Sequence, residues 1–267
     1  CSDNVQAACA ALAAFGALLV RLEMNEEEVK PDSSRLRVHI VGVMMAGLAH
    51  FEPEVHRTAL MIFCRDVFGE QRIRLARRCS LFKKVCKKLL TVVSEQRGSE
   101  ITFFNTAAML NHLYRMIIEC EVDIGPFAFP FPKAVAFFPG TFDPFSNGHK
   151  QIVTEILNRG FEVYLAIDEF SWSKRTQPKL LRRQIALMSV ADSADVFLFP
   201  DDIPINIANP DDLSRLKSLF PGNEIYLVAG SDVIENASAY ADPDLPGGAG
   251  YFNHILFKRS SGETPSD

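Results

Sequence analysis

Apolar and polar positions alternate with different periods in the two halves of the chain. Up to residue 123, long apolar segments with helical spacing are separated by short polar, proline or glycine breaks. They predict helices over residues 3–24, 36–51, 53–69, 70–97 and 100–121. Because short connections join helices of this length, we expect an all-α domain built as a bundle or as a helical-repeat stack.

Beyond residue 132, short apolar runs of strand length alternate with segments of helical spacing. The predicted strands cover residues 133–138, 162–168, 195–199, 224–229 and 253–257, and the predicted helices cover 148–159, 178–191, 209–219 and 232–240. Residues 163–167 and 225–229 are apolar throughout, as strands covered on both faces are. This alternation predicts an α/β domain with a Rossmann-like, doubly wound parallel sheet.

The two predicted domains meet at a proline-rich connector. Residues 125–132 contain three prolines and three phenylalanines, which predicts an extended segment packed against one of the domains. We therefore expect a helical domain of unknown role over residues 1–130 and an α/β domain over residues 131–267.

Charge is distributed unevenly. Residues 1–132 carry 16 Lys and Arg against 15 Asp and Glu, whereas residues 133–267 carry 12 against 18. The acidic second half argues against a nucleic-acid-binding face there. Eight basic residues between 72 and 88 alternate with an apolar stripe, which we interpret as the solvated face of an amphipathic helix. The alternative is a docking surface for an acidic protein, an RNA or another domain.

Cysteine and histidine positions indicate no metal site. All six cysteines lie within the first 120 residues and none forms a Cys-x-x-Cys pair, so we expect buried free thiols in a reducing cytoplasm rather than disulfides or zinc ligands. The histidines of the helical half lack metal-ligand spacing, and we expect them to be structural or surface residues.

The most apolar segment, residues 7–20, is shorter than a membrane span and has no basic segment before it. The pattern predicts a buried helix, no membrane contact and no signal peptide.

Candidate chemistry is concentrated at residues 138–149. An apolar strand ends in a turn that contains glycine and proline, and a helix begins at Asn147. Unsatisfied N–H groups and the helix dipole favour an anion at such a helix start. Because ligands of parallel sheets bind at the carboxyl ends of strands, we expect residues 168–174 and 230–232 to lie at the same edge. The dinucleotide and P-loop fingerprints are absent from the sequence.

Residues 140–149, Gly-Thr-Phe-Asp-Pro-Phe-Ser-Asn-Gly-His, resemble the signature of the nucleotidylyltransferase superfamily, Gly-x-Phe-Asp-x-x-(His/Thr)-x-Gly-His. The resemblance extends over about residues 133–257. Nicotinate-nucleotide adenylyltransferases look nearest, because of residues 172–175, 182–183 and 227–232. Residues 139–149 also resemble pantetheine-phosphate adenylyltransferase, and cytidylyltransferase activity or a non-catalytic nucleotide-binding or scaffold module remain alternatives.

The resemblance implies in-line attack of a phosphorylated acceptor, such as nicotinate mononucleotide, on the α-phosphate of ATP or another nucleoside triphosphate, with release of pyrophosphate and with Mg²⁺ as cofactor. Positioning and charge stabilisation carry most of such a reaction. The resemblance assigns catalytic roles to His149, Ser146 and Lys174. It assigns nucleotide binding to Gly140, Thr141, Phe142, Asn147, Gly148, Arg182, Arg183, Gly230, Ser231 and Asp232. A protein partner or a further domain is expected on the helical block.

Two departures from the family pattern stand out. Ser146 replaces the Thr or His of the signature, which keeps a hydroxyl donor but loses the charge of histidine. The family's late Ile-Ser-Ser-Thr-x-x-Arg segment has only a superficial echo at residues 259–264. We therefore expect the α/β domain to be truncated at its C-terminal end.

Overall fold

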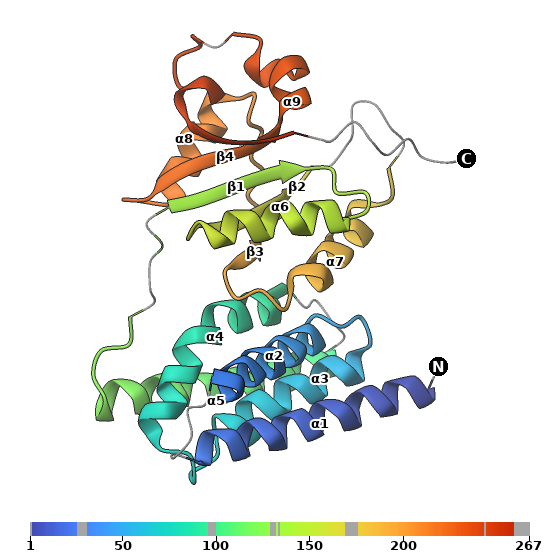
Figure 1. The fold of residues 1–267 in the computed structure, drawn as a ribbon, viewed down its shortest axis with the longest axis vertical. Helices are drawn as coiled ribbons and strands as arrows, with labels where there is room; N and C mark the ends of the chain where they lie inside the picture. Colours follow the sequence, from blue (N-terminus) through green and yellow to red (C-terminus); the bar gives the residue numbers. More distant parts are fainter. Residues whose placement is uncertain are drawn as a thin grey trace. The chain divides into compact units, whose positions relative to one another are not determined.

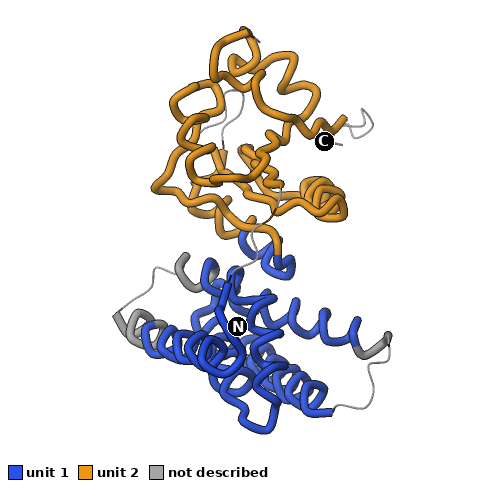
Figure 2. Tube along the Cα trace, turned by 90° about the vertical axis from the view of Figure 1, so that its left-hand side faces the viewer, with its two compact units in different colours: residues 1–130, 187–194 blue, residues 131–186, 195–267 orange. Residues whose placement is uncertain are grey.

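The structure, a computed structural model, describes residues 2–25, 31–95, 100–128, 132, 134–168, 176–242 and 244–258. Figure 1 shows the elements along the chain. The chain divides into two compact units, Cys1–Pro130 with Leu187–Ala194, and Phe131–Ala186 with Asp195–Asp267 (Figure 2).

The first unit is built from helices, as the sequence predicts. Its elements are α1 (Ser2–Met24), α2 (Pro31–Leu48), α3 (Pro53–Met61), the π-helix η1 (Ile62–Val67), α4 (Leu75–Glu95) and α5 (Glu100–Asp123). Helix α1 packs against α2, α3 and η1, and α4 packs against α5. The connector packs on this unit, because the ring of Phe127 lies 5.5 Å from that of Phe82 on α4.

Helix α1 differs from the buried helix that the sequence predicts. Only Leu12, Gly16 and Leu19 are buried among its described side chains, so the helix covers the unit with one narrow face. The segment Asn4–Met24 is long and apolar enough to cross a membrane, and 22% of its most apolar window is buried. The length argument against a span is therefore wrong. The core helix of a soluble protein or a signal sequence meets the same criteria of length and composition. The helix therefore does not indicate where in the cell the protein is located.

The cysteine prediction is wrong for one pair. Cys79 of α4 and Cys120 of α5 form a disulfide, because the packed helices bring their Cα atoms to 5.8 Å. Cys9, Cys64 and Cys86 are free thiols, and burial raises the pKa of Cys64 to about 12. Disulfides persist mainly in oxidising compartments, so the cysteines give no support to the cytoplasmic location, which stays a prediction.

His56 agrees with the histidine prediction, whereas the basic-helix prediction fails for Arg78 and Lys88. His56 is a core residue whose Nδ1 lies within hydrogen-bond distance of Leu48 O, and burial lowers its pKa. Of the six basic residues of α4, Lys84 is exposed, Arg77, Lys83 and Lys87 are partly buried, and Arg78 and Lys88 are buried. The apolar stripe around Phe82 is buried, as expected for an amphipathic helix.

The second unit contains a five-stranded, all-parallel sheet in the order β3-β2-β1-β4-β5. The strands are β1 (Ala134–Gly140), β2 (Glu162–Ile167), β3 (Val196–Leu198), β4 (Glu224–Gly230) and β5 (Asn253–Phe257). The helices are α6 (Asn147–Asn158), α7 (Lys179–Val190), α8 (Pro210–Leu219) and α9 (Ser231–Asn236). The predicted Rossmann-like fold class is confirmed, and the strand order reverses between β1 and β4.

Helices cover both faces of this sheet. Figure 1 shows α6 and α7 on one side of the strands and α8 and α9 on the other. Phe137 and Leu227 face the α8 side, where they form a core with Leu213 and Leu216. Phe138, the next residue of β1, faces the opposite side. Burial on both faces accounts for the uninterrupted apolar runs in β2 and β4.

Candidate active site at the carboxyl ends of β1, β2 and β4

The turn after β1 is organised by a cluster of aromatic rings. Phe142 has a positive φ of 45° and is buried. Its ring centroid lies 5.2 Å from those of both Phe138 and His149, and the ring of Phe145 lies 5.5 Å from that of His149. A left-handed backbone is costly for a bulky residue, and such conformations gather at functional sites. The cluster therefore fixes the turn that leads into α6.

Gly140 is favoured by this packing. A Cβ at position 140 would lie 3.1 Å from Cζ of Phe142, which is tighter than ordinary side-chain contact. The close approach of a nucleotide to Gly140 stays a prediction. The Phe142 ring, with its backbone fixed by the turn, already explains why glycine stands there.

His149 is held by the residue that begins its helix. Ser146 is the N-cap of α6, and its backbone N–H donates to Nδ1 of His149 across 3.0 Å. The hydroxyl of Ser146 also lies 3.0 Å from Nδ1. Since a nitrogen that accepts from an amide carries no proton, the neutral imidazole has its proton on Nε2. The contact therefore makes Nε2 of His149 a hydrogen-bond donor.

The helix start itself is exposed. Asn147 and Gly148 are exposed, and His149 is half-buried. The amide groups of the first helical turn have no acceptor inside the helix, and the dipole adds positive potential there. The structure thus places a helix N-terminus and an Nε2–H donor side by side at the end of β1.

Gly140 and Gly230 end the neighbouring strands β1 and β4, on either side of the point where the strand order reverses. The paired register of β1 and β4 ends at Phe137 and Leu227, three residues before each glycine. The side chain of Asp232 lies over Gly230, so that a Cβ there would meet Oδ1 at 2.4 Å. The prediction that residues 230–232 share an edge with the β1 turn agrees with this register.

Arg182 does not lie at the surface, where a phosphate ligand would be expected. Its side chain is fully buried, and its guanidinium donates to the carbonyl oxygens of Thr141, Asp168 (2.9 Å) and Gln177 (2.9 Å). These carbonyls belong to the loops after β1 and β2. Arg182 therefore acts as a brace that joins the two loops, a role that the sequence reveals only as a charge at a helix start.

Arg183 also forms its hydrogen bonds within the protein. It is 7% exposed and donates to Phe199 O (2.9 Å) and to Oδ1 of Asp201 (3.1 Å). The same carboxylate accepts from Lys179 at 3.1 Å. The structure brings Arg183 to the end of β3, away from the β1 turn in strand order.

Two contacts that the sequence analysis missed tie the β1 and β2 loops together. The Asp143 carboxylate accepts from the backbone N–H of Gln177 (2.9 Å), and the N–H of Asp168 donates to Gly140 O (3.0 Å). Desolvation raises the pKa of the Asp168 carboxyl, and the positive charges of Arg182 and Lys179 oppose that rise. Asp143 is the aspartate of the family signature at residues 140–149, so the sequence could have indicated a role for it.

Two predicted features lie outside the described residues. Lys174 belongs to residues 169–175, and residues 259–264, the echo of the late family segment, lie beyond residue 258. Their roles stay predictions.

The described side chains do not form a metal centre of their own. In the part of the chain that the structure describes, no three His, Cys, Asp or Glu residues are grouped as ligands. Mg²⁺ usually keeps several waters and binds through one or two carboxylates together with substrate phosphates. The described residues alone therefore do not fit a protein-only magnesium site.

Two comparisons with known proteins give a match. Residues 137–246 match the model of the cytidylyltransferase-like family. Among solved structures, the chain is similar to Plasmodium falciparum nicotinic acid mononucleotide adenylyltransferase complexed with NaAD. The identity is 16%, the match covers 48% of this chain and 75% of that chain, and the TM-score is 0.36. A search of curated proteins finds no match.

Proposed function

We propose that this protein transfers a nucleoside monophosphate from a nucleoside triphosphate to a phosphorylated acceptor, because residues 137–246 match the model of the cytidylyltransferase-like family. In the proposed reaction an acceptor phosphate oxygen attacks the α-phosphorus in line. The bond between the α-phosphorus and the bridging oxygen breaks, and pyrophosphate leaves. We propose ATP as the donor and a nicotinate-mononucleotide-like phosphate as the acceptor.

The observation that carries the proposal is the hydrogen bond between the Ser146 amide and Nδ1 of His149. It makes Nε2 a donor at the start of α6, next to the exposed residues Asn147 and Gly148 of the first turn. Charge builds on the phosphate oxygens in the transition state, and fixed donors stabilise that charge without reorganising. His149 is therefore assigned as the group that donates to an oxygen of the α-phosphate.

The nucleoside would occupy the other side of the strand-order reversal. Gly230 ends β4, the strand next to β1, and the exposed carboxylate of Asp232 follows it. A carboxylate accepts hydrogen bonds from ribose hydroxyls, as acidic residues after strands do in dinucleotide sites. We assign Ser231 and Asp232 to the nucleoside.

Arg182 acts as a positioning residue in this account. By holding the Thr141 and Asp168 carbonyls, it keeps the β1 and β2 loops in one arrangement. Correct positioning supplies a large part of the rate of phosphoryl transfer, so a displaced loop is costly. Lys174 keeps its assignment as a phosphate ligand by resemblance alone.

The proposal is tested by pyrophosphate release from the full chain. ATP and CTP are each supplied with Mg²⁺ and with a panel of acceptors that includes nicotinate mononucleotide and phosphopantetheine, and the His149→Ala variant is measured in parallel. We expect acceptor-dependent release that falls at least about tenfold in the variant. No release with any acceptor, or equal release from the variant, would overturn the assignment.

A further inference from the structure

The helical unit contains a cavity that the proposed transfer reaction does not use. It has a volume of about 210 Å³ and lies where η1, the turn after it, α4 and α5 come together. Cys64, Phe68 and Met116 form buried apolar parts of its lining. The cavity therefore offers apolar contact as well as polar groups.

Basic side chains dominate the polar lining. Arg65 of η1, Arg78 of α4, and His112 and Arg115 of α5 all line the cavity. His112 and Arg115 lie three residues apart, so both project from one face of α5. Among the described residues, three guanidiniums and one carboxylate, that of Glu119, line the space.

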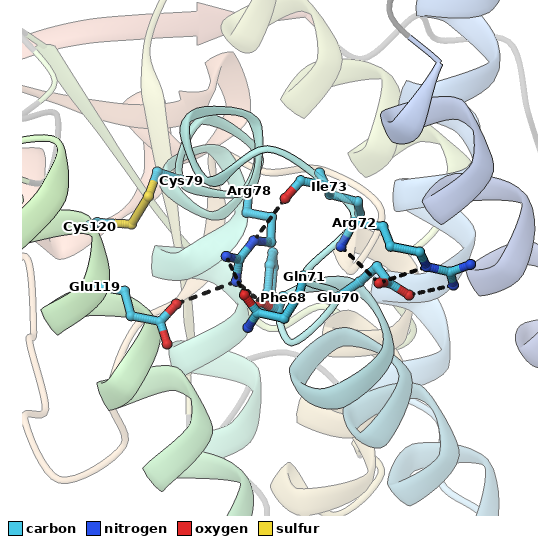
Figure 3. A network of polar contacts seen from close by, with 9 residues as sticks. All are labelled: Phe68, Glu70, Gln71, Arg72, Ile73, Arg78, Cys79, Glu119 and Cys120. Atoms are coloured by element: carbon cyan, nitrogen blue, oxygen red, sulfur yellow. Dashed lines mark hydrogen bonds and ion pairs between the residues drawn. A yellow bond between two sulfur atoms is a disulfide. The ribbon is translucent and has the colours of Figure 1, made fainter.

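Arg78 forms the inner wall and is not fully satisfied by the protein. Its side chain is 6% exposed, and Nε donates to Ile73 O at 3.3 Å. One terminal nitrogen contacts Phe68 O (2.8 Å) and Glu119 (3.4 Å), and the other reaches Oε1 of Gln71 only at 3.5 Å (Figure 3). Four contacts on five N–H groups leave one donor for a ligand among the described residues.

Arg115 and His112 are exposed residues of the cavity lining. Neither makes a hydrogen bond or an ion pair with any residue in the described ranges. Arg65 pairs with its own neighbour Asp66 at 2.8 Å, an exposed contact of small energy. With Asp66 and Glu119 set against three arginines, an excess of positive charge remains at the cavity.

The walls of the cavity are fixed by neighbouring covalent and ionic links. Arg78 and Glu119 form an ion pair, and the next residue of each helix, Cys79 and Cys120, forms the disulfide (Figure 3). The π-helix η1 supplies the opposite wall, and short π segments are common at functional sites. Rigid walls hold the arginines in place before a ligand arrives.

We propose that this cavity binds a small organic anion, with its phosphate or carboxylate group held by Arg78 and Arg115 and its apolar part against Phe68 and Met116. Both acid groups match the planar guanidinium fork, which makes bidentate contacts that an ammonium does not. The site is separate from the nucleotidyl-transfer site, since all of its residues belong to the helical unit.

The test follows the side-chain Nε–H resonances of Arg65, Arg78 and Arg115, together with that of Arg57, in the full chain while phenyl phosphate, benzoate or inorganic phosphate is added at constant ionic strength. Phenyl phosphate and benzoate distinguish the two acid groups, and inorganic phosphate reports the contribution of the apolar part. Arg115→Gln removes one fork at an exposed position. Arg57→Gln on α3 is the matched control, because Arg57 is exposed and lies outside the cavity lining.

We expect saturable shifts of the three cavity arginines with phenyl phosphate or benzoate, and weaker binding of inorganic phosphate. Arg115→Gln should raise the Kd at least about tenfold, as expected for the loss of a charged hydrogen bond, whereas Arg57→Gln should leave it unchanged. His149→Ala should also leave it unchanged. Shifts that do not saturate, or that affect Arg57 as strongly as Arg115, would overturn the proposal.

Discussion

The backbone N–H of Ser146 lies 3.0 Å from Nδ1 of His149 and donates to it. The contact joins the N-cap of α6 to the third residue of its first turn. It also determines the tautomer of the imidazole, because the remaining proton of a neutral ring must then sit on Nε2. The main chain, rather than the Ser146 side chain, is therefore sufficient to orient the donor.

Ser146→Ala should lower kcat/KM less than His149→Ala does. The alanine variant retains the backbone N–H that bonds Nδ1, whereas His149→Ala removes the donor to the phosphate and should cost at least about tenfold. Steady-state pyrophosphate release measures both variants. An equal loss in the two variants would instead assign a direct role to the Ser146 hydroxyl.

Arg182→Met should destabilise the second unit by at least about 3 kcal/mol. The substitution removes three hydrogen bonds from the guanidinium to backbone carbonyls, and a hydrogen bond to a charged group contributes about 1.5–3 kcal/mol. Urea unfolding gives the free energy of unfolding of each variant.

The matched control for that variant is Lys179→Gln on the same helix. Lys179 is partly exposed and pairs with Asp201, so its loss should cost about 1 kcal/mol or less. If Arg182→Met were no more destabilising than Lys179→Gln, the bracing role of Arg182 would be wrong.

Gly230→Ala and Asp232→Ala should both weaken nucleotide binding, because each removes the Asp232 carboxylate from its position. A Cβ at position 230 would meet Oδ1 of Asp232 at 2.4 Å, so the exposed carboxylate must turn away. Titration calorimetry with ATP should give similar increases in Kd for the two variants, and the double variant should be little worse than either. Fully additive losses would show that the glycine acts independently of Asp232.

Reduction of the disulfide should destabilise the helical unit. Cys79 and Cys120 are 41 residues apart, and closing a loop of that length stabilises a fold by up to about 4 kcal/mol in the chain-entropy account. Urea unfolding with and without reductant, compared with the Cys79→Ala, Cys120→Ala double variant, measures the effect. If the urea midpoint of unfolding were the same with and without reductant, the native protein would not contain the disulfide.

The sequence predicts the strands well because burial on both faces leaves a direct signal. Residues 225–229 are apolar throughout and lie within β4, and residues 163–167 lie within β2. The turn after β1 is equally readable, since its glycines and prolines allow few alternatives. These features depend on patterns among neighbouring residues, which can be recognised in a single sequence.

Long-range partners leave no such signal. The role of Arg182 depends on carbonyls 5, 14 and 41 residues away, and a carbonyl is present at every position of the chain. The disulfide depends likewise on how α4 packs against α5, and the spacing of Cys79 and Cys120 does not reveal it. The exposure of α1 is missed because an alanine-rich helix looks alike whether one face or all faces are covered.

The most direct test of the central claim is the response of the His149 imidazole to ATP in the full chain. We expect the Nε2 resonance of ¹⁵N-labelled His149 to shift with saturation as ATP is added, while Nδ1 keeps the shift of an acceptor. The proton on Nε2 should also become protected from exchange, because it bonds a phosphate oxygen. ATP binding that leaves both His149 nitrogens unperturbed, or no ATP binding at all, would contradict the account.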